Sequence, residues 1–266
     1  MNNIKEDLSN YNPEGSDLRR AQLKMLDILI EVSRICDRND IAYWISFGTL
    51  LGAVRHEGFI PWDDDLDIEI ESRNHKKLIK CLELELPYTM KIQHEGNDKN
   101  YFNKYIKVRD TKSVIHEDGS EYFKERGIFI DIFPRQHSSK ILKTIILKIL
   151  GNALVYSKSS LHLEKRKYFL QRMILRSRIL LYDLLVILNN FLSKIVTFKK
   201  LYTPSANRGV HEKIIFPLKE IIFEGKSFKC PSNIDAYLKL YYGDYMNIPK
   251  PENRIVHATK IEFYDD

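Results

Sequence analysis

Two acidic side chains, Asp65 and Asp67, alternate with apolar residues in the segment Asp-Leu-Asp-Ile-Glu-Ile. Successive side chains of a β-strand point to opposite faces, so Asp65, Asp67 and Glu69 are predicted to share one face of a strand. Carboxylates about 7 Å apart on one strand repel each other unless a cation lies between them, and Mg²⁺ prefers such oxygen ligands together with substrate phosphates. We therefore expect Asp65 and Asp67 to bind Mg²⁺, with Mn²⁺ as an alternative. A solvated acidic turn is the competing interpretation. Asp63 and Asp64 are interpreted as residues of the preceding loop or as groups that surround the metal ligands.

A Gly-Thr pair, Gly48-Thr49, lies upstream of these acids, after the apolar run 41–47 and before what is predicted to be a helix. The free backbone N–H groups at a helix N-terminus can bind a phosphate. Glycine more often simply serves a turn, so the pair gains its meaning only from the acids that follow.

A third acid, Asp131, is the only charged residue in the apolar run 127–134, which we predict to be a strand that ends at Pro134. A lone buried carboxylate is costly unless it is paired, hydrogen-bonded or bound to a metal. Backbone N–H groups could satisfy it. Beside Asp65 and Asp67 it would complete a three-carboxylate site, as a metal ligand or as the general base for an acceptor hydroxyl.

The string from Phe47 to Asp67, FGTLLGAVRHEGFIPWDDDLD, resembles the signature of the LicD family of phosphocholine transferases, which are relatives of fukutin and fukutin-related protein in the nucleotidyltransferase superfamily. Three further segments support the resemblance, which covers about residues 20 to 135 and 215 to 260: they are 105–110, 131–134, and 241–246 followed by His257. The resemblance implies that Gly48 and Thr49 form the phosphate turn, that Asp65 and Asp67 are the metal pair, and that Asp131 is the third acid.

The resemblance also implies a fold and a reaction. The fold is α/β (α+β), with a nucleotidyltransferase-type mixed sheet and flanking helices. The reaction is Mg²⁺-dependent transfer of phosphocholine from CDP-choline to a sugar hydroxyl of a cell-surface glycan precursor (teichoic acid, lipopolysaccharide or capsule), with release of CMP. The acceptor is expected to be linked to a lipid. The alternatives are another donor, such as CDP-ribitol, CDP-glycerol or a nucleoside triphosphate, and a non-enzymatic module that binds nucleotide or membrane.

Five other side chains are candidates for substrate binding. Arg55 could grip a phosphate with its guanidinium, and the adjacent His56 could assist or hydrogen-bond within its own loop. Trp62 could stack on a base or enclose the choline ammonium, although such a ring is more often part of the core. Lys107 could pair with the diphosphate or be a solvated residue of an edge strand. His257 could return to the donor phosphates or lie on the surface.

The chain has 266 residues, of which 44% are hydrophobic and 29% charged, as expected for a folded enzyme of one or two domains. Residues 140–200 contain thirteen Lys and Arg against two acids, a charge of +11, and the rest of the chain is −5. We predict a catalytic core at 17–137, a basic, apolar-rich helical subdomain at 138–203, and a C-terminal hairpin and helix at 204–266 that complete the catalytic domain. A stripe of Lys165, Arg172, Arg176, Asp183, Asn190 and Lys194 predicts a helix that packs within the subdomain or lies on an anionic membrane surface.

The remaining sequence patterns predict the secondary-structure elements and the cellular compartment. Helices are predicted at 17–39, 75–86 and 233–242, strands at 102–108 and 128–133, and a hairpin from 214 to 229. The three cysteines are scattered, which indicates neither a disulfide framework nor a zinc site. No signal peptide or nucleic-acid-binding motif is recognisable, so a cytoplasmic enzyme is expected, with peripheral contact at the inner face of the cell membrane as a further expectation.

Overall fold

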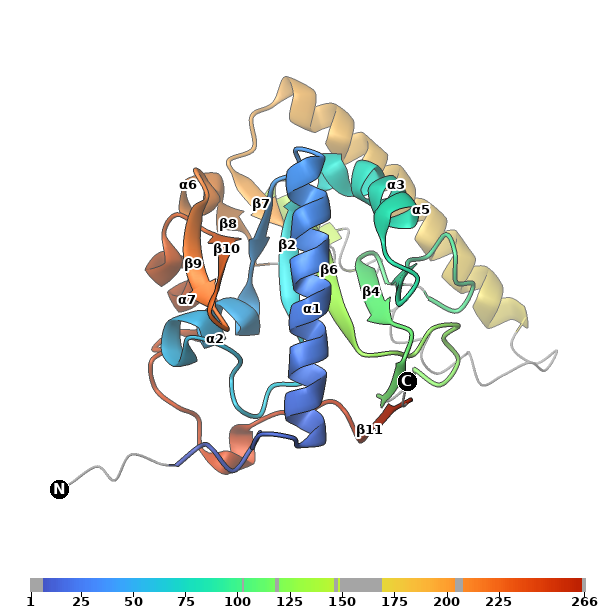
Figure 1. The fold of residues 1–266 in the computed structure, drawn as a ribbon. Coiled ribbons are helices and arrows are strands. Elements are labelled where there is room, and N and C mark those ends of the chain that lie inside the picture. Colours follow the sequence, from blue (N-terminus) through green and yellow to red (C-terminus); the bar gives the residue numbers. More distant parts are fainter. Residues whose placement is uncertain are drawn as a thin grey trace.

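A computed structural model describes residues 7–101, 103–117, 120–145, 148, 169–203 and 208–264. Its centre is a mixed sheet with helices packed around it, which confirms the predicted fold class (Figure 1). The strand order is β1 (Tyr43–Ile45), β2 (Asp67–Glu71), β6 (Phe129–His137), β4 (Ile106–Asp110) and β3 (Met90–Gln93). Only β2 and β6 are parallel along this path, so their N-terminal ends meet at one edge of the sheet.

The long helix α1 (Asp17–Arg38) lies across the sheet and buries one apolar side against it (Figure 1). The Ser16 Oγ caps this helix by accepting a hydrogen bond from the Arg19 N–H at 3.2 Å. The predicted helices at 75–86 and 233–242 are also confirmed, as α3 (His75–Glu85) and α7 (Ile234–Tyr242). The latter ends at Gly243, whose φ of 65° suits glycine.

Strand β6 continues to His137, so the prediction that Pro134 ends it is wrong. The pairing of β6 with β4 stops at Ile132, and its pairing with β7 (Lys200–Tyr202) begins only at Gln136. Proline lacks a backbone N–H, and Pro134 falls in the gap between these two antiparallel ladders, where no donor is required. Strand β8 (Val210–His211) then pairs with β7.

Two other strand boundaries differ from expectation. Strand β2 begins at Asp67, so Asp65 lies just before the strand, and β4 begins at Ile106, with Phe102 outside the described residues. The predicted C-terminal hairpin is present as β9 (Lys219–Phe223) and β10 (Lys226–Cys230), joined by Glu224 and Gly225, both at positive φ as in the commonest tight hairpin turns. Its expected first arm is instead the short helix α6 (Glu212–Ile215).

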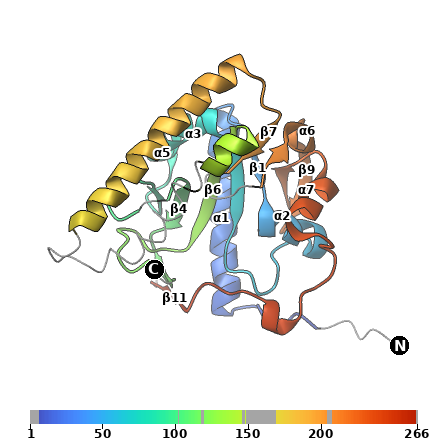
Figure 2. The ribbon, with the colours of Figure 1, turned by 180° about the vertical axis from the view of Figure 1, so that it is seen from behind.

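The C-terminal segment packs against β5 (Ser113–His116). After η3 (Pro251–Asn253), β11 (Lys260–Phe263) pairs with this strand. The remaining described elements are α2 (Phe47–His56), η1 (Ser72–Asn74) and α5 (Phe169–Ile195). In both views α5 runs along the outer edge of the molecule (Figures 1 and 2). In the described part of the chain, no helix is long and apolar enough to cross a bilayer.

The predicted helical subdomain is represented by α5 and by the segment that starts near Ser138. Tyr182 of α5 packs with Leu142, Leu185 and Val186 in a small apolar cluster that is separate from the main core. Lys165 of the predicted stripe lies outside the described residues. The division of the chain into 17–137, 138–203 and 204–266 stays a prediction.

Candidate active site

Asp67 and Asp131 lie side by side at the start of the two parallel strands. They are register partners across β2 and β6, and the Asp131 N–H donates to the Leu66 carbonyl at 2.8 Å. Neighbouring strands are separated by about 4.8 Å, so the two carboxyl groups emerge close together. The expected placement of Asp131 beside Asp67 is therefore observed, while the chemical roles of both residues stay predictions.

Asp63, which we placed in the loop or around the metal ligands, belongs to the same cluster. Its carboxyl group forms a hydrogen-bonded pair with that of Asp65. Its Oδ2 also lies against Gly48, where an added Cβ would stand only 2.8 Å away, so this glycine is needed for the close approach. The run of three consecutive acids at 63–65 was the available sequence signal.

Burial and mutual repulsion raise the pKa of all four carboxyl groups. The pKa of Asp63 and that of Asp67 lie well above the usual aspartate value because both groups are desolvated and face other carboxylates. Burial also raises the pKa of Asp65, and it raises that of Asp131 to about 6 even though Lys107 opposes the shift. A desolvated cluster of this kind is characteristic of functional sites and favours a bound cation.

The oxygen donors of this cluster suit a hard cation such as Mg²⁺. Within the described residues, however, no three His, Cys, Asp or Glu side chains converge closely enough to hold an ion. Asp131 is paired instead with the Lys107 ammonium, whose Nζ lies 2.8 Å from Asp131 Oδ1. The repulsion between the Asp65 and Asp67 carboxyl groups would be relieved by a metal ion bound to both of them. Asp131 already has a cationic neighbour in Lys107.

The surroundings of Lys107 rule out one of the two environments expected for it. Strand β4 lies between β6 and β3, so the alternative of a solvated residue on an edge strand is wrong. The side chain is buried, with its ammonium 3.1 Å from the centroid of the Phe129 ring and paired with Asp131. This position among the carboxylates is compatible with the predicted contact to a diphosphate, which stays a prediction.

The Gly-Thr pair lies in the first turn of α2. The Thr49 Oγ1 accepts a hydrogen bond from the Asp67 N–H at 2.8 Å, so it fixes the start of β2. The helix has no side-chain cap: Ser46 stands at the capping position, yet its buried Oγ has no partner among the described groups. Uncapped N–H groups at this end are available to an anion.

Arg55, His56 and Trp62 take structural positions around α2. Arg55 donates to the carbonyls of Tyr245 and Asn247 at 3.1 and 3.3 Å and to His56 Nε2 at 2.9 Å. His56 is the last residue of α2, so it bonds to its helical neighbour and not within a loop. Burial and the neighbouring Arg55 lower the pKa of His56 to about 4. Trp62 is buried, which agrees with its assignment to the core.

The C-terminal segment reaches the acids through Asp64. The backbone N–H groups of His257 and Ala258 both donate to Asp64 Oδ2, the first at 2.8 Å. The His257 ring is half exposed, and its Nδ1 lies 3.2 Å from Asp64 Oδ1 and 4.0 Å from Asp65 Oδ2. His257 thus lies beside the acids with a half-exposed ring, so both alternatives given for it hold in part and its contact with donor phosphates stays a prediction. The anchoring role of Asp64 was missed because its partners are distant in sequence.

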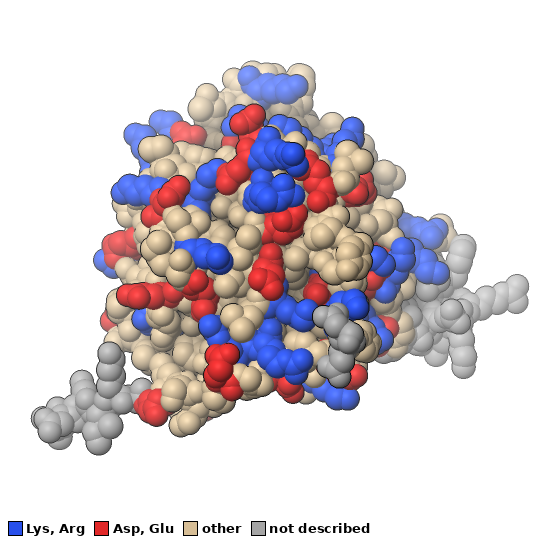
Figure 3. All heavy atoms as spheres, in the orientation of Figure 1, with Lys and Arg blue, Asp and Glu red and all other residues tan. Residues whose placement is uncertain are grey.

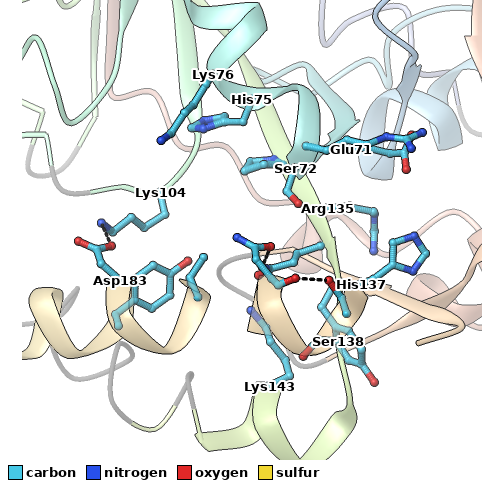
Figure 4. A pocket seen from close by; sticks show the side chains of 18 of the residues that line it. Glu71, Ser72, His75, Lys76, Lys104, Arg135, His137, Ser138, Lys143 and Asp183 are labelled. Carbon is cyan, nitrogen blue, oxygen red and sulfur yellow. Dashed lines mark hydrogen bonds and ion pairs between the residues drawn. The ribbon is translucent and has the colours of Figure 1, made fainter. Parts of the chain in front are cut away.

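A cavity lies beside the C-terminal end of β2 and the later part of β6. This cavity of about 580 Å³ is bounded by η1, α3, the end of β6 and α5, and Lys76, Lys104, Lys143 and Asp183 are among its side chains (Figure 4). The predicted site residues are all absent from its lining. No local sequence pattern predicts this cavity, because its walls come from segments far apart in the chain.

Comparisons with known proteins show which sequences this chain resembles. Residues 40–169 match the model of the LicD/FKTN/FKRP nucleotidyltransferase domain. The chain is 28% identical over 263 residues to the lipopolysaccharide cholinephosphotransferase LicD of Haemophilus influenzae, an alignment that covers 90% of this chain and 95% of that protein. An uncharacterized protein of Rickettsia prowazekii, RP689, is 37% identical over 94 residues, 35% of this chain and 34% of that protein. The acid cluster and the Gly-Thr turn both lie inside residues 40–169, which are therefore similar to the LicD/FKTN/FKRP nucleotidyltransferase domain.

Proposed function

We propose that the protein transfers phosphocholine from CDP-choline to a sugar hydroxyl of a lipopolysaccharide-type glycan and releases CMP. The observation that carries this proposal is the in-register pair Asp67 and Asp131, joined by Asp63 and Asp65, in a chain that aligns along most of its length with a cholinephosphotransferase. The family resemblance supplies the donor, and the carboxylate cluster supplies the reason for a metal.

In the proposed reaction the acceptor oxygen forms a bond to the phosphorus that bears choline, and the bond from this phosphorus to the CMP oxygen breaks. Asp131 would accept the proton of the acceptor hydroxyl, because a pKa raised to about 6 suits a base that works near neutrality. Lys107 would hold the Asp131 carboxylate in place. The uncapped start of α2, with Gly48, would bind a donor phosphate.

Asp65 and Asp67 would hold Mg²⁺, with Mn²⁺ as a substitute, and the ion would offset the charge that develops on the phosphoryl oxygens and on the departing CMP. His257 would remain within reach of the donor phosphates, since its ring lies beside Asp65 and is half exposed. The Asp64 contacts keep this part of the C-terminal segment at the site.

The test measures CMP release from CDP-choline by purified protein, with and without Mg²⁺ and with and without a lipopolysaccharide acceptor that lacks phosphocholine. Release that requires the metal and the acceptor, and that is lost in Asp67→Asn, would support the proposal. Asp27→Asn is the matched control, because it removes the same charge from an exposed position of α1.

Two outcomes would contradict the proposal. Release from CDP-ribitol or CDP-glycerol but not from CDP-choline would overturn the donor. Absence of release from every donor and acceptor, with a folded protein, would overturn transferase activity and favour a binding module.

A further inference from the structure

Helix α5 presents a continuous apolar face that the described residues leave uncovered. Its large side chains are between 46% and 68% exposed at six positions: Leu180, Leu184, Ile187, Leu188, Phe191 and Ile195. At 100° per residue these positions fall within an arc of about 100°. Exposed apolar surfaces of this extent on a folded protein usually mark a site of interaction with another surface.

Side chains outside this apolar arc fasten α5 to the body of the protein. The Asn189 Nδ2 donates to the His137 carbonyl at 2.8 Å, and the Gln136 Nε2 donates to Asn190 Oδ1 at 2.7 Å. Tyr182 is buried, and Asp183 is paired with Lys104 at 2.9 Å. The helix is therefore held in a fixed orientation with its apolar side outward.

The charges on α5 favour an anionic partner. Asp183 is the only acid of the helix and already has the Lys104 partner, whereas Arg176 and Lys194 are exposed along the same border of the apolar arc. The face of the molecule that carries α1 instead mixes both signs of charge (Figure 3). The region from 140 to 200 has a net charge of +11.

These charges distinguish between the two main occupants. A symmetric contact with a second copy would bring two strongly basic regions together, which is unfavourable. Anionic lipid headgroups would attract the basic border while the acyl region accepts the apolar side chains. The helix is not apolar enough to cross the bilayer, so it would lie in the interface.

We propose that α5 is a membrane-docking helix, whose outer face inserts into the interface of an anionic lipid bilayer with Arg176 and Lys194 at the level of the headgroups. This inference is independent of the donor and of the acceptor. A protein docked in this way would keep the β11 and α2 sides of the molecule clear of the lipid, because α5 lies along a separate edge (Figures 1 and 2).

The experiment is co-sedimentation with vesicles of phosphatidylcholine alone and of phosphatidylcholine with phosphatidylglycerol. We expect at least about tenfold stronger partitioning to the anionic vesicles, weakened by salt. The double variant Leu184→Asp/Phe191→Asp should lose at least about tenfold of this partitioning. The control Leu84→Asp/Ile222→Asp introduces the same charges at positions 85% and 52% exposed outside α5 and should bind as the wild type does.

A second readout decides the question if the double variant does not fold. Trp44 and Trp62 are both buried, so a tryptophan introduced by Phe191→Trp would dominate any change of fluorescence on vesicle addition. A blue shift with anionic vesicles supports docking. An unshifted spectrum, equal sedimentation of the wild type and the α5 double variant, or a solution dimer that the double variant dissociates would each overturn it.

Discussion

Strand β2 carries Asp67 at its start and Glu69 farther along, and the surroundings of these two acids differ. Glu69 pairs with Arg135 at 2.5 Å and also accepts hydrogen bonds from Trp44 and Tyr237. At the N-terminal end, Asp67 and Asp131 share one nearby ammonium, that of Lys107, with two further carboxyl groups. Asp67 and Glu69 are both acids that alternate with apolar residues on one strand, so the sequence pattern does not distinguish them. Their neighbours in the fold do: Asp67 lies among other carboxyl groups, whereas Glu69 is part of a structural ion pair.

The largest effect is expected at Asp67. Asp67→Asn should lower CMP release at least about 1000-fold, because the proposed metal loses a charged ligand. The same change should leave the melting temperature unchanged or higher, since it removes a buried charge that repels Asp65 and Asp131. Steady-state kinetics and calorimetry of one preparation measure both quantities. Strong destabilisation by Asp67→Asn would mean that Asp67 and Glu69 do not differ in kind.

How far the sequence could predict this contrast depends on the range of the interactions. Asp65, Asp67 and the helices at 17–39 and 75–86 were accessible because alternation and helical periodicity are local. The approach of Asp131 to Asp67 was expected from the family resemblance and not from periodicity. Arg135 could not be assigned as the partner of Glu69, because that contact depends on the extension of β6 beyond Pro134.

The contacts that shape the site are also long-range. Asp64 meets His257 across 193 positions of the chain, and the cavity of Figure 4 is assembled from segments that are far apart in the sequence. An edge position is one of the two alternatives for Lys107, because the order of strands in the sheet cannot be known from one sequence. Such features require the tertiary fold, so they were either missed or left as alternatives.

Around Glu69, Arg135→Met should lower the free energy of unfolding by about 3 kcal/mol, because it leaves Glu69 buried without its cation. The remaining donors, Trp44 and Tyr237, keep the loss near the lower limit for a broken buried pair. The double variant Arg135→Met/Glu69→Gln should recover part of the loss in chemical denaturation. If the double variant were as unstable as the sum of the two single variants, the pair would not be coupled.

An effect of intermediate size is expected at Asp64, which anchors the C-terminal segment. Asp64→Ala leaves the N–H groups of His257 and Ala258 without their acceptor and should cost about 2 kcal/mol. Hydrogen exchange should then become faster at these two amides and in β11. Asp27→Ala, on the exposed side of α1, is the control. Unchanged exchange in β11 would show that its pairing with β5 suffices to hold the segment.

The smallest effect is expected at an acid with an ordinary partner. Burial raises the pKa of Glu224, but hydrogen bonds from Arg19 and from the Phe59 N–H outweigh this and lower it below its usual 4.5. Such a group stabilises the fold above its unfolded pKa of about 4.3, and the contribution disappears as the pH falls through the folded pKa. Glu224→Gln should therefore lower the free energy of unfolding by less than about 1 kcal/mol at pH 7 and by almost nothing near pH 3.

The raised pKa of Asp67 predicts a pH dependence of opposite sign. The gain in the free energy of unfolding from Asp67→Asn should therefore grow as the pH rises. Urea unfolding at pH 3, 5 and 7 measures both slopes, and slopes of equal sign would contradict the distinction between paired and clustered acids.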